Sequence, residues 1–523
     1  MNNCEIGRKQ LDLWKASLKE NAADEDFLHT VQLYKKELET ELKAFGKKVT
    51  EELEPLVNEN NLGSNLPRLD PYDGVGNRID EIIHHPTYDA AGNIIYSTKL
   101  LEKMSKPGGL VVALSFMFLS SHAGEAGHNC PLACSAGIIR VLQKVNNITK
   151  APDYIKKLIE PSYTNNYTGA QFVTEIQGGS DVGLNSTQAT QNNDGTWNIK
   201  GEKWFCSNCD AELILLTARF DPSLDGTKGL GLFLIPKEIN GKKNNYTIRR
   251  LKDKIGTRSM ASAEIDFNGA TAFAVGDPKD GFKLLMENVL HLSRLFNTVC
   301  CLGMAKRAYT IALNYAKHRI AFKHPIIDYP LVQDNLTTIK AENSALIASI
   351  FKTASLQDKA DLENPSDETK LLLRLLANLN KYLSALWSVN HIHRALDVLA
   401  GNGAIESFSP IPRLLRDSIV CENWEGTHNT LRMQIQRDIS KYQIDKLFFN
   451  YLNIEDSVLK DEPEKIRVMI ESLENDPLII RQIVDRMGIL FAAHSLFEEA
   501  KTNSSKAKHY EYFKKIHFNK STY

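Results

Sequence analysis

Apolar residues recur at helical spacing through most of the first 160 residues. In FLHTVQLYKKELETELKAFGKKVTEELEPLV (27–57) they lie three and four positions apart, with charges on the opposite face, which is typical of amphipathic helices. The most apolar run, 109–124, is shorter than the ~20 residues that span a bilayer, so we expect a buried central helix. Loops are predicted at 68–86 and 89–93, where Gly, Pro and Asn gather.

The pattern changes near Tyr167. Up to about residue 273, short segments rich in β-branched and aromatic residues alternate with turn signals such as NNDG (192–195) and DPSLDG (221–226). No helical period lies between these segments. The pattern therefore predicts a β domain rather than a parallel α/β sheet.

Helical spacing returns from Gly281 onward in long, strongly apolar segments, which predicts a helical bundle. A further helical segment follows residue 440. We therefore expect a mainly α protein with a central β domain. Its predicted parts are an N-terminal helical domain (1–165), a β domain (166–275), a C-terminal helical bundle (276–440) and a helical extension (441–523).

Composition narrows the class of protein. Apolar residues make up 42% and charged residues 24%, with a net charge of −1, as in ordinary soluble globular proteins and unlike basic nucleic-acid binders. The eight cysteines follow no regular framework, which suits a reducing compartment. The N-terminus has no signal-peptide core. We expect a cytoplasmic protein without a membrane partner.

The stretch FVTEIQGGSD (172–181) is a candidate ligand-binding turn. A predicted strand leads into two glycines, and Thr174, Ser180 and Asp181 lie close to them in the sequence. Glycines let the backbone approach an anion or a planar ring, and hydroxyls add directed hydrogen bonds. The alternative is a plain β-turn.

EKWFCSN (202–208) is a second candidate. Strand alternation places Phe205 and Ser207 on one face, with Trp204 and Cys206 on the other. An aromatic ring beside a hydroxyl suits a flat cofactor, although ordinary sheet packing gives the same pattern. No G-x-G-x-x-G follows a strand, so a dinucleotide would not be held by a Rossmann unit.

The stretch VCENWEGTHN (420–429) places Glu425 between Trp424 and Gly426. An indole neighbour makes the surroundings apolar, which raises a carboxylate pKa toward the working range of a base. A glycine leaves room for a substrate to approach. The alternative is an acid at a helix entry beside a core tryptophan.

Six stretches resemble the acyl-CoA dehydrogenases in their order and spacing over residues 165–440: VTEIQGGSD, GEKWFCSN, LKDKIGTRS, YAKHRIAF, LAGNG and WEGT. The stretches at 70–86 (DPYDGVGNRIDEIIHHP) and 124–131 (GEAGHNCP), together with the C-terminal extension, resemble the AidB-like branch. The resemblance implies the family fold, with a middle β-sandwich or barrel, and FAD as cofactor.

The resemblance also assigns cofactor contacts. Thr174 and Ser180 would bond the flavin and its phosphate, Phe205 would pack on the isoalloxazine ring, and Ser207 would lie near flavin N5. The remaining implied contacts are Arg319 and Phe322 to the FAD of a neighbouring subunit, Gly401 at the pyrophosphate, and Thr427 and Asn429 at the phosphates or adenine. Asp397, Ala400 and the stretch 322–325 depart from the family pattern.

On the substrate side, the resemblance implies that Arg294 grips the nucleotide end of CoA, a role that suits its planar guanidinium. Ser180, Trp424 and Gly426 would also line the substrate site. The catalytic base would be Glu425, because the other family position holds Ser293, which cannot serve. Glu287 is the nearest rival acid on that helix.

The implied function is FAD-dependent α,β-dehydrogenation of an acyl-CoA in fatty acid metabolism, with hydride transfer to flavin N5. The implied assembly is a homotetramer, and the electron acceptor would be electron-transfer flavoprotein or another carrier. The alternative is an AidB-like flavoprotein with little turnover that binds nucleic acid or sequesters acyl-CoA. Only 501–520 leans basic, and we interpret it as a solvated terminus.

Overall fold

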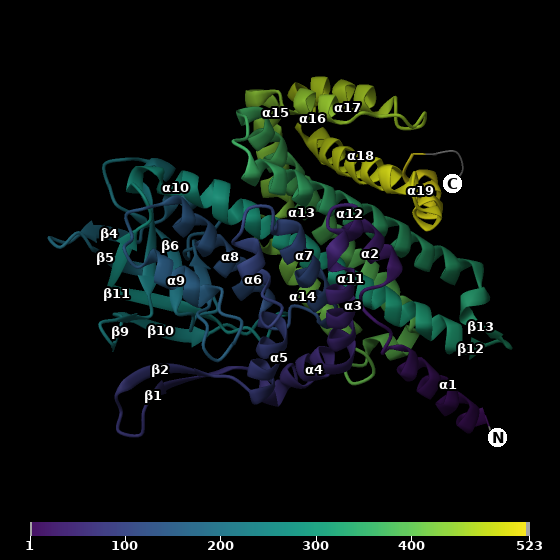
Figure 1. Ribbon diagram of the computed structural model, residues 1–523, viewed down its shortest axis with the longest axis horizontal. Helices are drawn as coiled ribbons and strands as arrows, with labels where there is room; N and C mark the ends of the chain where they lie inside the picture. The colour runs from purple at the N-terminus through teal and green to yellow at the C-terminus, as the bar shows by residue number, and fades with distance from the viewer. Residues whose placement is uncertain (1–2, 519–523) are drawn as a thin grey trace. The chain divides into compact units, whose positions relative to one another are not determined.

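A computed structural model describes residues 3–518 of the chain (Figure 1). Its contacts form two compact units. The bundle unit contains residues up to 54, residues 107–124 and the chain from Arg294 onward; the sheet unit contains residues 55–106 and 125–293. Each unit draws on more than one of the four predicted segments, whose boundaries stay a prediction. The expected mainly α fold with a central β domain is confirmed.

The bundle unit is built from helices whose apolar stripes face one another. They are α1 (Asn3–Ser17), α2 (Glu25–Gln32), α3 (Glu39–Lys48), α7 (Leu110–Ser120), α11 (His291–His318), α12 (Pro330–Leu362), α13 (Asp367–Val398), α14 (Ile411–Asn423), α15 (His428–Tyr442), α16 (Ile444–Tyr451), α17 (Glu462–Glu471), α18 (Ile480–Ala500) and α19 (Ser504–His517). The long helix α12 packs on α13, α7, α18 and α19.

Helix α7 is the predicted buried central helix, and the prediction is confirmed: nearly all of its residues are buried. Its first turn is capped from another helix, because the carboxylate of Asp358 accepts hydrogen bonds from the main-chain N–H groups of Leu110 (2.7 Å) and Val111 (3.0 Å). Among residues 3–518, no helix is long and apolar enough to cross a membrane.

The C-terminal helices are part of the bundle, not a solvated end. Helices α18 and α19 run along α12 (Figure 1). Lys506 on α19 is fully buried, where its Nζ pairs with Glu499 (2.8 Å) and Asp26 (3.3 Å) and donates to Thr30 Oγ1 (2.9 Å). The expectation of a solvated terminus is wrong for this described part, because a buried lysine can be held by carboxylates from distant elements.

The sheet unit combines strands and shorter helices. They are α4 (Glu54–Asn60), β1 (Arg68–Tyr72), β2 (Arg78–Ile83), α5 (Pro86–Tyr96), α6 (Leu100–Met104), α8 (Asn129–Lys144), α9 (Ala151–Leu158), β3 (Gly169–Phe172), β4 (Gln188–Gln191), β5 (Trp197–Ser207), β6 (Leu213–Arg219), β7 (Leu230–Pro236), β8 (Glu238–Ile239), β9 (Lys242–Lys243), β10 (Tyr246–Leu251), β11 (Ser262–Ala274) and α10 (Gly281–Leu284).

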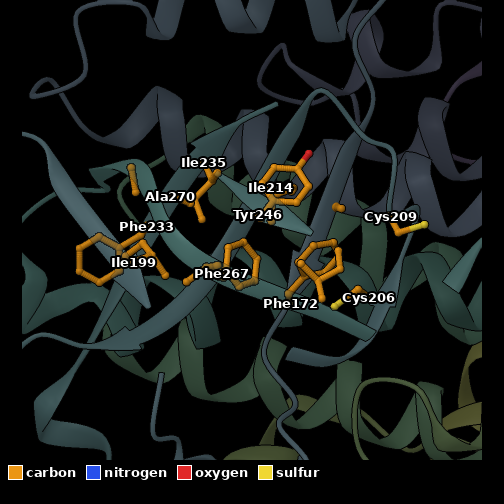
Figure 2. Packing of buried hydrophobic residues seen from close by; sticks show 14 of the residues in the cluster. Phe172, Ile199, Cys206, Cys209, Ile214, Phe233, Ile235, Tyr246, Phe267 and Ala270 are labelled. Atoms are coloured by element: carbon orange, nitrogen blue, oxygen red, sulfur yellow. The ribbon is translucent and has the colours of Figure 1, made fainter. Parts of the chain in front are cut away.

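Five strands of this unit close on themselves. In the order β11-β5-β4-β6-β7 each strand is bonded to the next, and β7 pairs back with β11, while β3 and β10 extend the sheet. The ring encloses an apolar cluster that includes Phe172, Ile199, Phe233 and Phe267 (Figure 2). The closed ring leaves few unpaired edges and a rigid frame for the residues on β5 and β11.

Both predicted N-terminal loops are wrong. Residues 68–83 form the hairpin β1–β2. Leu69 and Ile82 pack against the apolar cluster, and buried Asp80, which also accepts from Arg78 Nε (3.0 Å), accepts from the main-chain N–H of Ile248 (3.2 Å). Residues 89–93 lie inside α5. Gly92 is there for close packing, since a Cβ would lie 2.8 Å from the ring of Tyr163.

Candidate active site

The loop between α14 and α15 places Glu425 in a left-handed backbone conformation, with φ of 58° followed by 105° at Gly426. Three hydrogen bonds hold this loop. Lys381 on α13 donates from Nζ to the carbonyl oxygens of Glu422 (2.9 Å) and Gly426 (2.7 Å), and Arg294 on α11 donates from Nε to that of Glu425 (3.2 Å). The position of the Glu425 backbone is therefore fixed from two helices.

The electrostatics of this loop favour a poised carboxylate. Burial raises the pKa of Glu425 above the usual 4.5, against the opposing attraction of Arg294 and Lys381. Burial also lowers the pKa of Lys381 to about 8. A partly buried acid whose proton affinity is raised while two cations lie nearby is the kind of group that serves as a general base.

Arg294 is buried, with 4% of its surface exposed. Besides the bond to Glu425, its Nη1 donates to Oδ1 of Asn378 (2.6 Å). These bonds show that the arginine supports the loop that carries Glu425. Contact with the nucleotide end of CoA stays a prediction.

The neighbours of Glu425 take distinct places. Trp424, partly exposed, ends α14 in an extended conformation. A Cβ at Gly426 would have its nearest contact 3.5 Å away, at Leu431, so its positive φ, not crowding, favours glycine. Ser293 is buried, and Glu287 is exposed. Their assigned or excluded roles stay predictions.

The turn after β3 is anchored by a buried ion pair. Glu175, between Thr174 and the glycines, lies 2.7 Å from Nζ of Lys203 on β5, and both side chains are fully buried. Burial opposes ionisation, but Lys203 and hydrogen bonds from Ser186 and Thr187 lower the pKa of Glu175 to about 2. The ion pair therefore links the stretch 172–181 to the stretch 202–208.

The exposed side of this turn carries the other predicted contacts. Thr174 is partly buried, and Ser180 is exposed. A Cβ on Gly179 would lie 2.5 Å from Thr174 Oγ1, so the glycine lets the turn pack against the threonine. The turn thus presents hydroxyl groups on a fixed backbone.

Strand β5 presents Phe205, with 53% of its surface exposed, and partly exposed Ser207. The predicted alternation fails here: the pairing with β11 slips between Lys203 and Cys206. This β-bulge buries both of those residues and brings the rings of Trp204 and Phe205 around one amine. Nζ of Lys252 lies 3.5 Å and 4.9 Å from their ring centroids.

The remaining predicted residues lie on the surface of the bundle unit. Arg319 follows α11, and Phe322, 90% exposed, lies at the tip of the hairpin formed by β12 (Ile320–Ala321) and β13 (His324–Pro325). Gly401 is exposed in the turn after α13. Thr427 caps α15 by accepting from the N–H of Thr430, and the exposed Asn429 accepts from Arg432 (3.1 Å).

The bundle unit therefore gathers Arg294, Trp424, Glu425 and Gly426, and the sheet unit gathers Thr174, Ser180, Phe205 and Ser207. Sequence reasoning missed Lys381, Lys203 and Glu175. A signal was present for the first: Lys381 interrupts an apolar helical run, NLNKYLSAL (378–386). The sheet-unit residues suit a flat anionic cofactor, because the exposed Phe205 ring can stack and the hydroxyls of Thr174 and Ser207 can bond.

Along the chain, helices precede a closed β ring, and a helical bundle follows it. Together with the residues that suit a flat cofactor, this order defines the class of acyl-CoA dehydrogenase flavoproteins. Family models agree along the chain: the acyl-CoA dehydrogenase middle domain matches residues 170–270, and the C-terminal domain matches 279–440. The chain belongs to the acyl-CoA dehydrogenase family, whose cofactor is FAD and whose members are oxidoreductases. Residues 17–165 match the N-terminal domain of the adaptive response protein AidB.

Similar proteins span most of the chain. Acyl-CoA dehydrogenase family member 11 of Caenorhabditis elegans is 29% identical over 83% of this chain and 72% of its own. The putative acyl-CoA dehydrogenase AidB of Escherichia coli (strain K12) is 29% identical over 72% and 70%. The apo-form of Bd2924 has a TM-score of 0.86, is 27% identical, and the match covers 91% of this chain and 97% of that one.

The structure of C. elegans ACDH-11 in complex with C11-CoA has a TM-score of 0.85 over 96% of this chain and 95% of that one. At 24% identity this match concerns the fold.

Proposed function

We propose that this protein dehydrogenates the α,β-bond of an acyl-CoA thioester, with Glu425 as the catalytic base. The observation that carries the proposal is the partly buried carboxylate of Glu425, with its raised pKa and its loop held by Arg294 and Lys381. The α-proton of a thioester is weakly acidic, so a base with a pKa near the working pH is needed. That ACDH-11 was solved with C11-CoA supports the substrate class.

In this proposal Glu425 takes the α-proton on its carboxylate. When bound, FAD supplies the acceptor for the hydride that leaves the β-carbon. Trp424 limits water beside the base, and Gly426 leaves space for the thioester. Ser180 and Arg294 are proposed on the CoA side. The two electrons then pass to electron-transfer flavoprotein or another carrier.

The test is Glu425→Gln, which keeps the shape and cannot take a proton. The variant should retain FAD and acyl-CoA binding. Its rate of flavin reduction, measured by anaerobic stopped flow, should fall by ~10²–10⁴-fold, which is the contribution of a general base. Glu287→Gln, at the exposed acid that is the nearest rival for the role of base, is the matched control and should reduce at the wild-type rate. Reduction by Glu425→Gln at the wild-type rate would sink the assignment and favour an acyl-CoA or nucleic-acid binder with little turnover.

We infer a homotetramer in which Arg319 and Phe322 reach the FAD of a neighbouring subunit. The exposed ring of Phe322 supports this, since a large apolar side chain at a hairpin tip gains from being covered. Arg319→Ala should weaken FAD retention on gel filtration, whereas Lys317→Ala, an exposed cation two residues earlier, should not. A wild-type monomer that is fully loaded with FAD in light scattering would refute the inference.

A further inference from the structure

Three polar side chains form a hydrogen-bonded series that ends at Ser207, two residues after the exposed Phe205 on β5. Lys254, which follows β10, donates from Nζ to the carbonyl oxygen of Met260 (2.9 Å) and to Oγ of Ser262 (2.9 Å). Ser262 opens β11 and is paired in register with Ser207, the last residue of β5. The two serine hydroxyl oxygens lie 2.9 Å apart.

The chemistry of the lysine sets the direction of this chain. An ammonium group has donors only, so Oγ of Ser262 accepts from Lys254. Ser262 is 2% exposed, and a buried hydroxyl proton without an acceptor is costly. Among residues 3–518 the acceptor within hydrogen-bond distance of that proton is Oγ of Ser207, so Ser262 donates to Ser207.

The hydroxyl proton of Ser207 is therefore left to donate to a bound molecule that is not part of the protein. It is partly exposed, and Phe205 beside it on β5 is more exposed still. Its oxygen accepts from a hydroxyl that is itself polarised by a cation, and such chains strengthen each bond in turn. The surface beside the Phe205 ring thus offers a hydrogen-bond donor with a positive charge behind it.

We propose that Lys254 is a positioning residue for the flavin: acting through Ser262, it holds Ser207 as an outward donor and raises the reduction potential of the bound cofactor. The proposal rests on the proposed FAD site beside Phe205 and Ser207. Reduction adds negative charge to the flavin. A donor backed by a nearby cation in a partly buried site stabilises that charge more than it stabilises the neutral oxidised ring.

The experiment measures the midpoint potential of FAD in the full-length protein by equilibration with a reference dye. Lys254→Met keeps the side-chain length and removes the charge and donors. The ratio of reduced to oxidised flavin at a fixed potential should fall at least tenfold, a shift of about 30 mV for a two-electron couple. Ser262→Ala, which leaves the lysine in place and breaks the chain, should also lower the potential. Lys254→Arg should restore most of it.

Lys252→Met is the matched control. Lys252 lies on the Trp204 and Phe205 rings and pairs with Glu264, so it takes no part in the hydrogen bonds that link Lys254, Ser262 and Ser207. If it lowers the potential as much as Lys254→Met, the general field of the lysines is responsible and the proposal is wrong. An unchanged potential in Lys254→Met with FAD in place also overturns it. A wild-type protein that binds no FAD overturns the proposed function as well, and FAD absorbance separates that outcome from the others.

Discussion

Glu425 combines a raised pKa with two neighbouring cations, Arg294 and Lys381. A base works only when deprotonated, so the rate of flavin reduction should fall as the pH drops through this raised pKa. Lys381→Met removes one cation, so the pKa of Glu425 should rise further and the acidic limb should move to higher pH. Stopped-flow rates across the pH range measure the limb.

Lys381→Arg is the control for this prediction, since it keeps the charge and should leave the limb near its wild-type position. A limb that stays in place in Lys381→Met would show that the lysine acts only through its bonds to the carbonyl groups of Glu422 and Gly426.

At the level of single residues, the sequence pointed to Glu425 through its immediate neighbours. It could not show the groups that hold that residue. Lys381 and Gly426 are 45 positions apart, and the lysine bonds main-chain oxygens, which carry no residue-specific signal. Glu175 and Lys203 were missed for a related reason: charged residues are almost never fully buried unless paired, and only the packing of the turn after β3 against β5 brings these two together.

The hairpin β12–β13 illustrates the element scale. Its two tip residues, Phe322 and Lys323, both have left-handed backbones, with φ of 51° and 75°. For a side chain with a Cβ this conformation costs ~1–2 kcal/mol. Lys323→Gly should therefore raise the thermal midpoint, with a gain of about 1 kcal/mol after the extra freedom of glycine in the unfolded chain is counted. Lys323→Ala keeps the Cβ and should bring no such gain.

Equal midpoints for the glycine and alanine variants would show that the tip is not strained. The hairpin also contains the stretch 322–325, which departs from the pattern of the family that the sequence resembles. Lys323→Gly leaves Arg319 and Phe322 unchanged. Because FAD retention depends on those two residues in our proposal, the variant should gain stability without losing FAD.

Most elements could be predicted from periodicity. The strands of the β domain and the helices of the bundle and of the tail are where alternation and helical spacing place them. The exceptions have physical reasons. The hairpin β1–β2 is held by bonds of Asp80 and Arg78 to the backbone of Ile248 as well as by apolar packing. Gly92 serves close packing inside a helix, and a bulge in β5 breaks the alternation at Trp204 and Phe205.

On the scale of the whole molecule, α19 is tied to α2 by charges. Burial opposes ionisation of Asp26, but Lys506 and Lys340 hold its pKa well below the usual 3.8. Lys306 and Lys340 likewise lower the pKa of Asp24 to about 2. Acids with lowered folded pKa values contribute stability above their unfolded pKa, and this is lost as the pH falls toward the folded value. Between about pH 4 and pH 2 the bundle unit should therefore lose stability.

Amide hydrogen exchange of α19 measures this loss. The helix should lose protection over that window, and Lys506→Met should lose protection already at neutral pH, because it leaves Asp26 and Glu499 buried with fewer counter-charges. Lys508→Met, on the same helix and exposed, is the control and should exchange like the wild type. Protection of α19 that does not change between neutral pH and pH 2 would contradict the role of these charges.

The bond between Lys506 and Thr30 joins positions 476 residues apart, and this has a consequence for biosynthesis. At about 5–20 residues per second, the ribosome needs roughly 25–95 s to add the lysine after the threonine. During that interval the nascent chain carries Asp26 without its last counter-ion. The N-terminal helices can then close around this charge only after α19 has been synthesised, so the emerging chain depends on water or a chaperone to cover that surface until this helix arrives.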